Sequence, residues 1–129
     1  MAKVFASIKK EAYKIEIKSP TGNVITADEP VGNGGKDTGF SPKELLAAAL
    51  SACTSATLRM YLDRKEWDVQ EIKVETELVQ TENKTTFIRK MAFTGHLNDE
   101  QKKRLIKIAN ACPVHQILTG TIEFDTTII

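Results

Sequence analysis

Apolar and polar residues alternate along much of the chain, which is the pattern of β-strands with one buried face. The alternation is clean over 12–18, where Tyr13, Ile15 and Ile17 point one way and charged residues point the other. Polar turns at 20–23 and 81–84 join neighbouring strands. We therefore predict strands at 4–8, 12–18, 24–27, 69–80, 85–96 and 121–127.

The segment 41–64 predicts a long helix without a polar face. Ser41 suits the N-cap, Pro42 the first helical position and Glu44 the third, so Ser41 and Glu44 can form a capping box. Every residue of 45–58 is uncharged, and all are apolar or small. A helix of this kind is normally buried on all sides, and a domain this small rarely encloses one alone. We therefore expect a partner chain to cover it.

A second helix is predicted from the capping box at Asn98 and Gln101 to about Cys112, with Pro113 ending it. Its inward face carries residues at helical spacing: Leu105, Ile108, Ala109 and Cys112. The element order is βββ-α-ββ-α-β, with the strands mostly joined as hairpins. This order predicts an α+β fold with antiparallel sheet in a single domain, 1–129.

Composition narrows the classes of function. Charged residues make up 27% of the chain and leave a formal net charge of +1, whereas nucleic-acid binders usually carry a basic excess. The N-terminal residues lack the apolar core of a signal peptide, so we expect a cytoplasmic protein. The segment 45–62 has the length of a membrane span, but its Ser and Thr residues and Arg59 make it a poor one. Neither a nucleic acid nor a membrane is expected as a partner.

A glycine-rich loop, 28–40, precedes the long helix. Its Gly35-Lys36 pair resembles part of a phosphate-binding loop, but Pro30 occupies the position of the first glycine. Asp37 also replaces the Ser or Thr that follows the lysine in such loops. The loop is therefore predicted to be a flexible connection.

The two cysteines are the main candidates for chemistry. Cys53 lies in the middle of the long helix and Cys112 on the inward face of the second. In a reducing compartment, two cysteines are more often free, catalytic or redox-active than joined in a structural disulfide. Simple packing is the alternative, because free cysteine is among the most buried residue types. The two are 59 positions apart, so no local C-x-x-C motif supports a redox function.

The helix dipoles do not favour a thiolate at either cysteine. Cys53 lies beyond the first turn of its helix, and Cys112 lies at a C-terminal end, where the dipole raises a thiol pKa. A thiolate at Cys53 therefore needs a cationic or hydrogen-bonding neighbour, and His115 is the candidate. Zinc ligation by Cys53, Cys112, His96 and His115 is a further alternative. A single C-x-x-H is weak support for it, and no metal is expected.

Three stretches of the chain resemble the OsmC/Ohr family: Asp28-Glu29-Pro30, GGKDTGFSPKELLAAALSACTSATLRMYLDRKEW and Cys112-Pro113-Val114-His115. The element order fits as well, and the resemblance covers nearly the whole chain. It implies an intertwined homodimer with two long central helices packed between sheets. It also implies a thiol peroxidase that reduces organic hydroperoxides without a metal or bound cofactor. By position, Cys53 matches the family's peroxidatic cysteine and Cys112 its resolving cysteine.

Two positions depart from the best-studied members of that family. Those enzymes stabilise the thiolate with an arginine from the N-terminal region, but the first arginine here is Arg59, so a lysine or His115 would have to substitute. Their glutamate directly follows the proline that starts the helix, where this chain has Lys43 and then Glu44. Nine helical residues separate Glu44 from Cys53, a rise of about 14 Å. If Glu44 contributes to the site, it should reach Cys53 from the partner chain.

The sequence therefore predicts a homodimeric thiol-dependent peroxidase. A Cys53 thiolate would reduce an organic hydroperoxide and become a sulfenic acid, Cys112 would close a disulfide with it, and an external dithiol would restore both. The alternative is a non-catalytic OsmC-like dimer that binds a small apolar ligand in the interface cleft. The missing N-terminal arginine favours that alternative.

Overall fold

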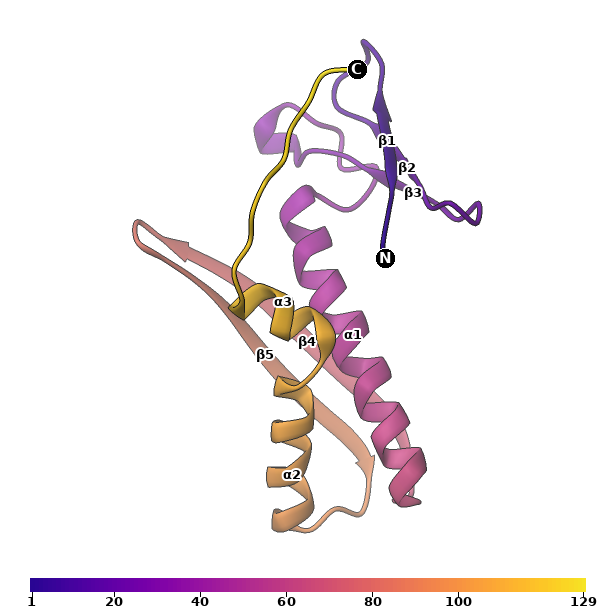
Figure 1. Cartoon of the computed structure of the whole chain (residues 1–129), viewed down its shortest axis with the longest axis vertical. Helices are drawn as coiled ribbons and strands as arrows, with labels where there is room; N and C mark the ends of the chain where they lie inside the picture. Colours follow the sequence, from indigo (N-terminus) through magenta and orange to yellow (C-terminus); the bar gives the residue numbers. More distant parts are fainter. The chain divides into compact units, whose positions relative to one another are not determined.

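The computed structural model describes residues 1–129, which divide by their contacts into two compact units, Met1–Leu46 and Ala47–Ile129. Unit 1 contains a three-stranded antiparallel sheet of β1 (Phe5–Ile8), β2 (Ile15–Lys18) and β3 (Val24–Ala27), in that order (Figure 1). Ile15 and Ile17 of β2 are half-buried, whereas Glu16 and Lys18 between them are exposed. The faces of β2 are therefore those that the alternation predicts, but the strand begins only at Ile15, so Tyr13, which is 43% exposed, lies outside it.

The loop that follows β3 is folded around one carboxylate. Asp28 is buried, and its Oδ1 accepts a hydrogen bond from the Glu29 N–H at 2.8 Å. Its Oδ2 accepts from the N–H groups of Lys36 and Thr38 at 3.3 and 3.1 Å, and from the Thr38 hydroxyl at 2.6 Å. A short 3-10 helix, η1 (Val31–Asn33), lies within the same loop. The amides that a phosphate-binding loop would offer to a ligand are thus bonded to a side chain of the loop itself.

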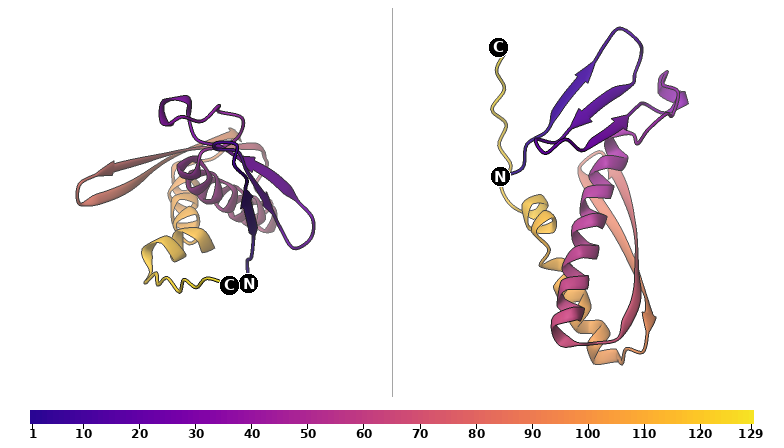
Figure 2. Two further views of the ribbon diagram at one scale, coloured as in Figure 1. Left: turned by 90° about the horizontal axis from the view of Figure 1, so that it is seen from above. Right: turned by 90° about the vertical axis from the view of Figure 1, so that its right-hand side faces the viewer.

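In unit 2, helices pack on one face of a long hairpin (Figures 1 and 2). β4 (Val69–Thr81) and β5 (Lys84–Gly95) are antiparallel and remain paired along their length. α1 (Pro42–Lys65), which begins in unit 1, and α2 (Asp99–Asn110) contribute side chains to one core with the hairpin. A third helix, α3 (Pro113–Thr119), follows α2 after a two-residue break.

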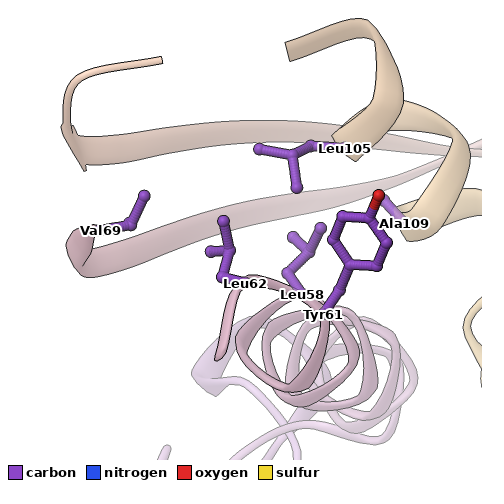
Figure 3. Close-up of a cluster of buried hydrophobic side chains, with 6 residues drawn as sticks. All are labelled: Leu58, Tyr61, Leu62, Val69, Leu105 and Ala109. Atoms are coloured by element: carbon purple, nitrogen blue, oxygen red, sulfur yellow. The ribbon is translucent and has the colours of Figure 1, made fainter. Parts of the chain in front are cut away.

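The core of unit 2 is a cluster of buried side chains drawn in Figure 3: Leu58, Tyr61, Leu62, Val69, Leu105 and Ala109. Leu58 and Leu62 come from α1 and Leu105 from α2, and all three are fully buried. Burying one such leucine stabilises the fold by roughly 1.5–3 kcal/mol. This cluster fixes α1 and α2 against the hairpin and so determines which α1 residues reach α3.

Within the single chain, α1 is buried along one side only. Leu50, Thr54, Leu58 and Leu62 are buried, but the small or apolar residues Ala49, Ala52, Ala56 and Met60 are exposed. By length and composition α1 could also cross a membrane, a test that the core helix of a soluble protein passes too.

The α+β fold class is confirmed, but one predicted element is wrong. Residues 121–127, predicted as the last strand, form no strand, and the chain is drawn as a coil there (Figure 1). Ile122 is 49% exposed and Phe124 is 89% exposed. A strand requires a neighbour for its backbone hydrogen bonds, and the alternation of apolar residues predicts a face without supplying that neighbour.

The second helix also ends earlier than predicted. α2 stops at Asn110 rather than near Cys112, and Pro113 begins α3, which the sequence analysis did not anticipate. Pro113 ends one helix and also begins the next, because proline suits the first position of a helix as well as the position after its end. Cys112 is therefore the N-cap residue of α3 and not the last residue of α2.

Candidate functional site

The two cysteine sulfurs accept hydrogen bonds from consecutive backbone amides at the start of α3. Sγ of Cys53, on α1, accepts from the Val114 N–H at 3.4 Å. Sγ of Cys112 accepts from the His115 N–H, also at 3.4 Å. Both residues are free cysteines, with Cys53 half-buried and Cys112 fully buried.

The local sequence explains why these amides are free to bind sulfur. The first N–H groups of a helix have no partner within it, and Pro113 at the first position has no N–H at all. Val114 and His115 therefore carry the first donors that need a partner. The two sulfurs, one local and one from α1, satisfy them.

Thr54 connects this pair to the rest of the site. Its side chain is fully buried, and Oγ1 lies 2.7 Å from the Leu50 carbonyl, to which it donates. The same oxygen lies 3.8 Å from Cys112 Sγ, and either atom can be the donor. It also accepts a hydrogen bond from Arg89 at 3.0 Å. One hydroxyl therefore contacts a carbonyl, a thiol and a guanidinium.

Arg89, on β5, is the cation of the site. Its Nη1 donates to Thr54, its Nη2 donates to Asn110 Oδ1 at 2.7 Å, and Nη2 lies 3.2 Å from His115 Nδ1. Three elements, α1, α2 and the start of α3, thus supply partners to one side chain. A guanidinium stays protonated in proteins, so a fixed positive charge lies near Cys112.

These groups change the acidity of Cys112. Burial raises the pKa of its thiol, but the hydrogen bond from the His115 N–H and the contacts with Thr54 and Cys53 lower it. The charge of Arg89 acts in the same direction, and the net result is a pKa below the ordinary value of a cysteine. Hydrogen bonds and a nearby cation favour a thiolate in this way.

His115 is a neutral partner in this arrangement. Burial and, second, the charge of Arg89 lower the pKa of its ring. Because a guanidinium only donates, the Nδ1 atom that faces it must be the unprotonated acceptor. The ring of His115 therefore orients Arg89, while its main chain binds Cys112.

A cavity of about 1180 Å³ with a mixed polar and apolar lining opens beside this network, between the hairpin, α2 and α3, and neither cysteine lines it. Arg89 and His115 lie in its wall. Much of the rest is aliphatic or aromatic: Leu50, Phe87, Met91, Phe93, Ile106 and Leu118. A small organic molecule could therefore lie against the guanidinium and imidazole groups.

The remaining candidates from the sequence lie elsewhere. Glu44 Oε1 accepts from the Ser41 N–H at 2.8 Å, and Ser41 Oγ accepts from the Glu44 N–H at 3.2 Å, so the capping box is formed. This box is in unit 1, and the network described above is in unit 2. His96 lines the cavity and is exposed. No three His, Cys, Asp or Glu side chains are grouped so as to hold a metal ion.

Arg89 is the residue that the sequence analysis missed. Phe87, Met91 and Phe93 were assigned to the inward face of their strand, and Arg89 occupies the same face by the two-residue period. An arginine among inward apolar residues was the available signal. It has Thr76 as its cross-strand neighbour, so a polar pair interrupts this face of the hairpin.

Comparison with known proteins gives a consistent assignment of the fold. A model of the OsmC-like protein family matches residues 34–127, while none of the curated proteins matches the chain. A structure of a candidate osmotic stress induced and detoxification response protein from Psychrobacter arcticus 273-4 is 25% identical. It matches over 90% of this chain and 85% of that chain, with a TM-score of 0.76.

Two further solved structures are named as organic hydroperoxide resistance proteins. The protein from Elizabethkingia anophelis is 22% identical, with 95% of this chain and 91% of that chain covered and a TM-score of 0.69. The protein from Legionella pneumophila is 21% identical, and the match covers 93% of this chain and 90% of that chain with a TM-score of 0.65. At these identities the likeness is one of fold.

Proposed function

This chain belongs to the OsmC-like protein family, and from that premise we propose that it reduces organic hydroperoxides with its two cysteines. The observation that carries the proposal is the pairing of Cys53 and Cys112 on consecutive amides of α3. A hydroperoxide reductase needs one sulfur to take the peroxide oxygen and a second within reach to close a disulfide. The names of the structural relatives from Elizabethkingia anophelis and Legionella pneumophila support the same substrate class.

In the proposed reaction, the Cys53 thiolate attacks the distal oxygen of the hydroperoxide. The O–O bond breaks, Cys53 becomes a sulfenic acid, and the alkoxide that leaves takes a proton from solvent to become the alcohol. Cys112 then displaces water from that sulfur to form the disulfide, which an external dithiol reduces. The greater exposure of Cys53 supports its role as the attacking sulfur.

A non-catalytic dimer that binds a small apolar ligand is the second candidate. The size of the cavity and the aliphatic and aromatic side chains in its wall favour it. The argument from the missing N-terminal arginine is weaker than the sequence suggested, because Arg89 supplies a cation near Cys112 from a different strand. We therefore place the reductase first.

Turnover of cumene hydroperoxide with a dithiol tests the choice between these functions. We expect the wild-type protein to consume the peroxide and the Cys53→Ser variant to be inactive. Intact-mass analysis after one equivalent of peroxide should show a disulfide in the wild type, and sulfenic or sulfinic acid at Cys53 in Cys112→Ser. Two unmodified thiols after treatment would leave only the ligand-binding function.

We propose that the working form is a cytoplasmic homodimer, each chain a single OsmC-like domain. The exposed row of small and apolar residues on α1 supports a partner helix there. A Glu44 from the partner chain would complete each site in this dimer. Wild type mixed with the Glu44→Gln/Cys53→Ser double variant tests this, because a composite site leaves the mixed dimer inactive and a single-chain site leaves it half active.

A further inference from the structure

We infer that Arg89 and Thr54 hold Cys112 as the thiolate that closes the disulfide. Their network therefore acts on the second step of the proposed reaction, after Cys53 has taken the peroxide oxygen. This inference rests on the proposed function and deepens it, because a resolving cysteine needs only to reach the oxidised sulfur. The surroundings of Cys112 supply more than reach, since they suit a negative charge.

The hydroxyl and amide donors of the site are divided unequally between the two sulfurs. Sγ of Cys112 accepts from the His115 N–H at 3.4 Å and lies 3.8 Å from Thr54 Oγ1. Sγ of Cys53 accepts from the Val114 N–H. Although Thr54 directly follows Cys53 in the sequence, successive residues of a helix are turned by about 100°. The hydroxyl therefore serves the sulfur of the other cysteine.

Arg89 carries a positive charge that no carboxylate neutralises. Its partners are the Thr54 hydroxyl at 3.0 Å, the Asn110 amide oxygen at 2.7 Å and Nδ1 of the neutral His115 ring at 3.2 Å. No Asp or Glu forms an ion pair with this half-buried side chain. A nearby anion stabilises a partly desolvated cation. A Cys112 thiolate can supply that anion, with Thr54 Oγ1 between the two charges.

Thr54 can serve both protonation states of Cys112. A hydroxyl has one proton, and Thr54 can donate it either to the Leu50 carbonyl or to Cys112 Sγ. In the first arrangement the Thr54 oxygen can accept the S–H of a Cys112 thiol, and in the second it donates to a Cys112 thiolate. The hydrogen bond from Arg89 to the same oxygen makes the hydroxyl a better donor and so favours the thiolate.

The step that this thiolate performs is the closure of the disulfide. The Cys112 thiolate attacks Sγ of the Cys53 sulfenic acid, and the S–S bond forms as the S–O bond breaks. The hydroxide that leaves takes a proton from solvent to become water. A neutral thiol would first have to lose its proton, so the ionised fraction of Cys112 determines the rate of closure.

The other titratable groups at this site keep their protonation state during closure. Arg89, from β5, remains charged. His115, from α3, remains neutral because its Nδ1 faces the guanidinium as an acceptor, and Cys53, from α1, is the oxidised sulfur. Burial raises the pKa of the Cys112 thiol, but contacts led by the His115 N–H and the Thr54 hydroxyl bring that pKa below its ordinary value. The pH dependence of closure therefore reports the ionisation of Cys112.

A thiol probe tests the inference on the whole chain without any peroxide. 2,2′-Dipyridyl disulfide reacts with Cys53, the less buried thiol, and gives a mixed disulfide and a first pyridine-2-thione. The Cys112 thiolate then attacks the Cys53 sulfur, closing the disulfide and releasing a second pyridine-2-thione. The rate of this second phase does not depend on probe concentration, and intact-mass analysis checks that no pyridyl group remains. Its profile from about pH 5 to about pH 10 measures the ionisation of Cys112.

We expect Arg89→Met to slow the second phase about tenfold at neutral pH and to raise its pH midpoint by about one unit. Thr54→Val should act in the same direction. Arg89→Lys and Thr54→Ser, which keep the charge and the hydroxyl, should restore part of the rate. Near about pH 10 the rates should converge, because Cys112 then ionises without help. A sulfur that was merely displaced would close the disulfide slowly at every pH.

The matched control is Lys90→Met, which removes the exposed cation next to Arg89 in β5. It should leave both phases unchanged. In Arg89→Met, the first phase should keep its wild-type rate, because that phase is the attack of Cys53 on the probe. Three results would each overturn the inference: a wild-type profile in Arg89→Met, a loss that persists at high pH, or equal slowing of both phases.

Peroxide turnover separates this inference from the proposed function. If the wild type consumes cumene hydroperoxide and Arg89→Met closes the disulfide with a wild-type pH profile, the reductase stands and the inference fails. If hydroperoxide leaves both wild-type thiols unmodified, the proposed function fails. The probe experiment then still decides whether Arg89 and Thr54 hold Cys112 as a thiolate.

Discussion

Asp28 shows how a single carboxylate can organise a loop. Four donors, three of them backbone amides, converge on it. The hydrogen bonds, led by that from the Thr38 hydroxyl, lower the pKa of Asp28 to about 2. The same side chain begins the Asp-Glu-Pro stretch by which the sequence resembles its family. A structural explanation therefore suffices for this part of the motif.

We predict that Asp28→Asn destabilises unit 1 at neutral pH and flattens its acid response. A carboxyl whose pKa is lowered on folding contributes stability above its unfolded value of 3.8, and this is lost as pH falls through about 2. Wild type should therefore lose stability between these values more steeply than the variant, as measured by urea unfolding at a series of pH values. Asp37→Asn, an exposed change in the same loop, is the control. Parallel pH profiles for wild type and Asp28→Asn would contradict the argument.

At this scale, spacing in the sequence predicted some side-chain positions and not others. The capping boxes at Ser41 and Asn98 are local, and both formed as expected. Cys53 and Cys112 meet the start of α3, and Arg89 meets Thr54 and His115, only because α1, β5 and α3 pack together. No pattern in the sequence encodes such long-range contacts, although the inward register of Arg89 could have been read from its strand.

At the scale of the elements, Leu105 packs α2 against the hairpin and α1. Leu105 is fully buried in the core cluster, whereas Ile106, the next residue, is 53% exposed. α2 leads directly to Cys112, so its docking also determines where the start of α3 lies. The stability of the core and the geometry of the sulfur pair are therefore linked through this helix.

We predict that Leu105→Ala lowers the free energy of unfolding by about 2–5 kcal/mol. Ile106→Ala, on the exposed side of the same helix, should cost far less, within about 0.5 kcal/mol. Chemical denaturation monitored by circular dichroism measures both. Equal losses would mean that Leu105 is not part of the cooperative core.

The predicted order of elements was right up to α2 and failed after it. Periodicity and caps identified five strands and two helices, because those signals are local. α3 is only seven residues long, too short for a periodic pattern. Its first residue, Pro113, is as typical of the end of a preceding helix as of the start of a new one. The last predicted strand, 121–127, failed because its pairing partner lies outside its own sequence.

At the scale of the whole molecule, the exposed apolar side of α1 favours assembly with a second chain. Ala49, Ala52, Ala56 and Met60 form a row at helical spacing that the rest of unit 2 leaves exposed. Small residues allow a second helix to approach closely. The row lies on the helix that carries Cys53, so assembly and chemistry would share one element.

We predict that the protein is a dimer in solution and that Ala56→Asp weakens it. A charge in the middle of an apolar contact must be desolvated without a partner. Size-exclusion chromatography with light scattering should show a dimer for wild type and for Lys103→Asp, an exposed control on α2. A well-folded wild-type monomer at micromolar concentration would defeat the argument.

A disulfide between Cys53 and Cys112 would cross-link two parts of unit 2 that lie 59 positions apart in the sequence. In the denatured state this bond would close a loop that contains the residues of the hairpin and of α2. Closing a loop of this length removes enough conformational entropy from the denatured state to stabilise the folded one by roughly 4 kcal/mol. We therefore expect the peroxide-treated protein to unfold at higher urea concentration than the reduced protein. Cys112→Ser should remove the difference, so resistance to unfolding would report the redox state of the protein.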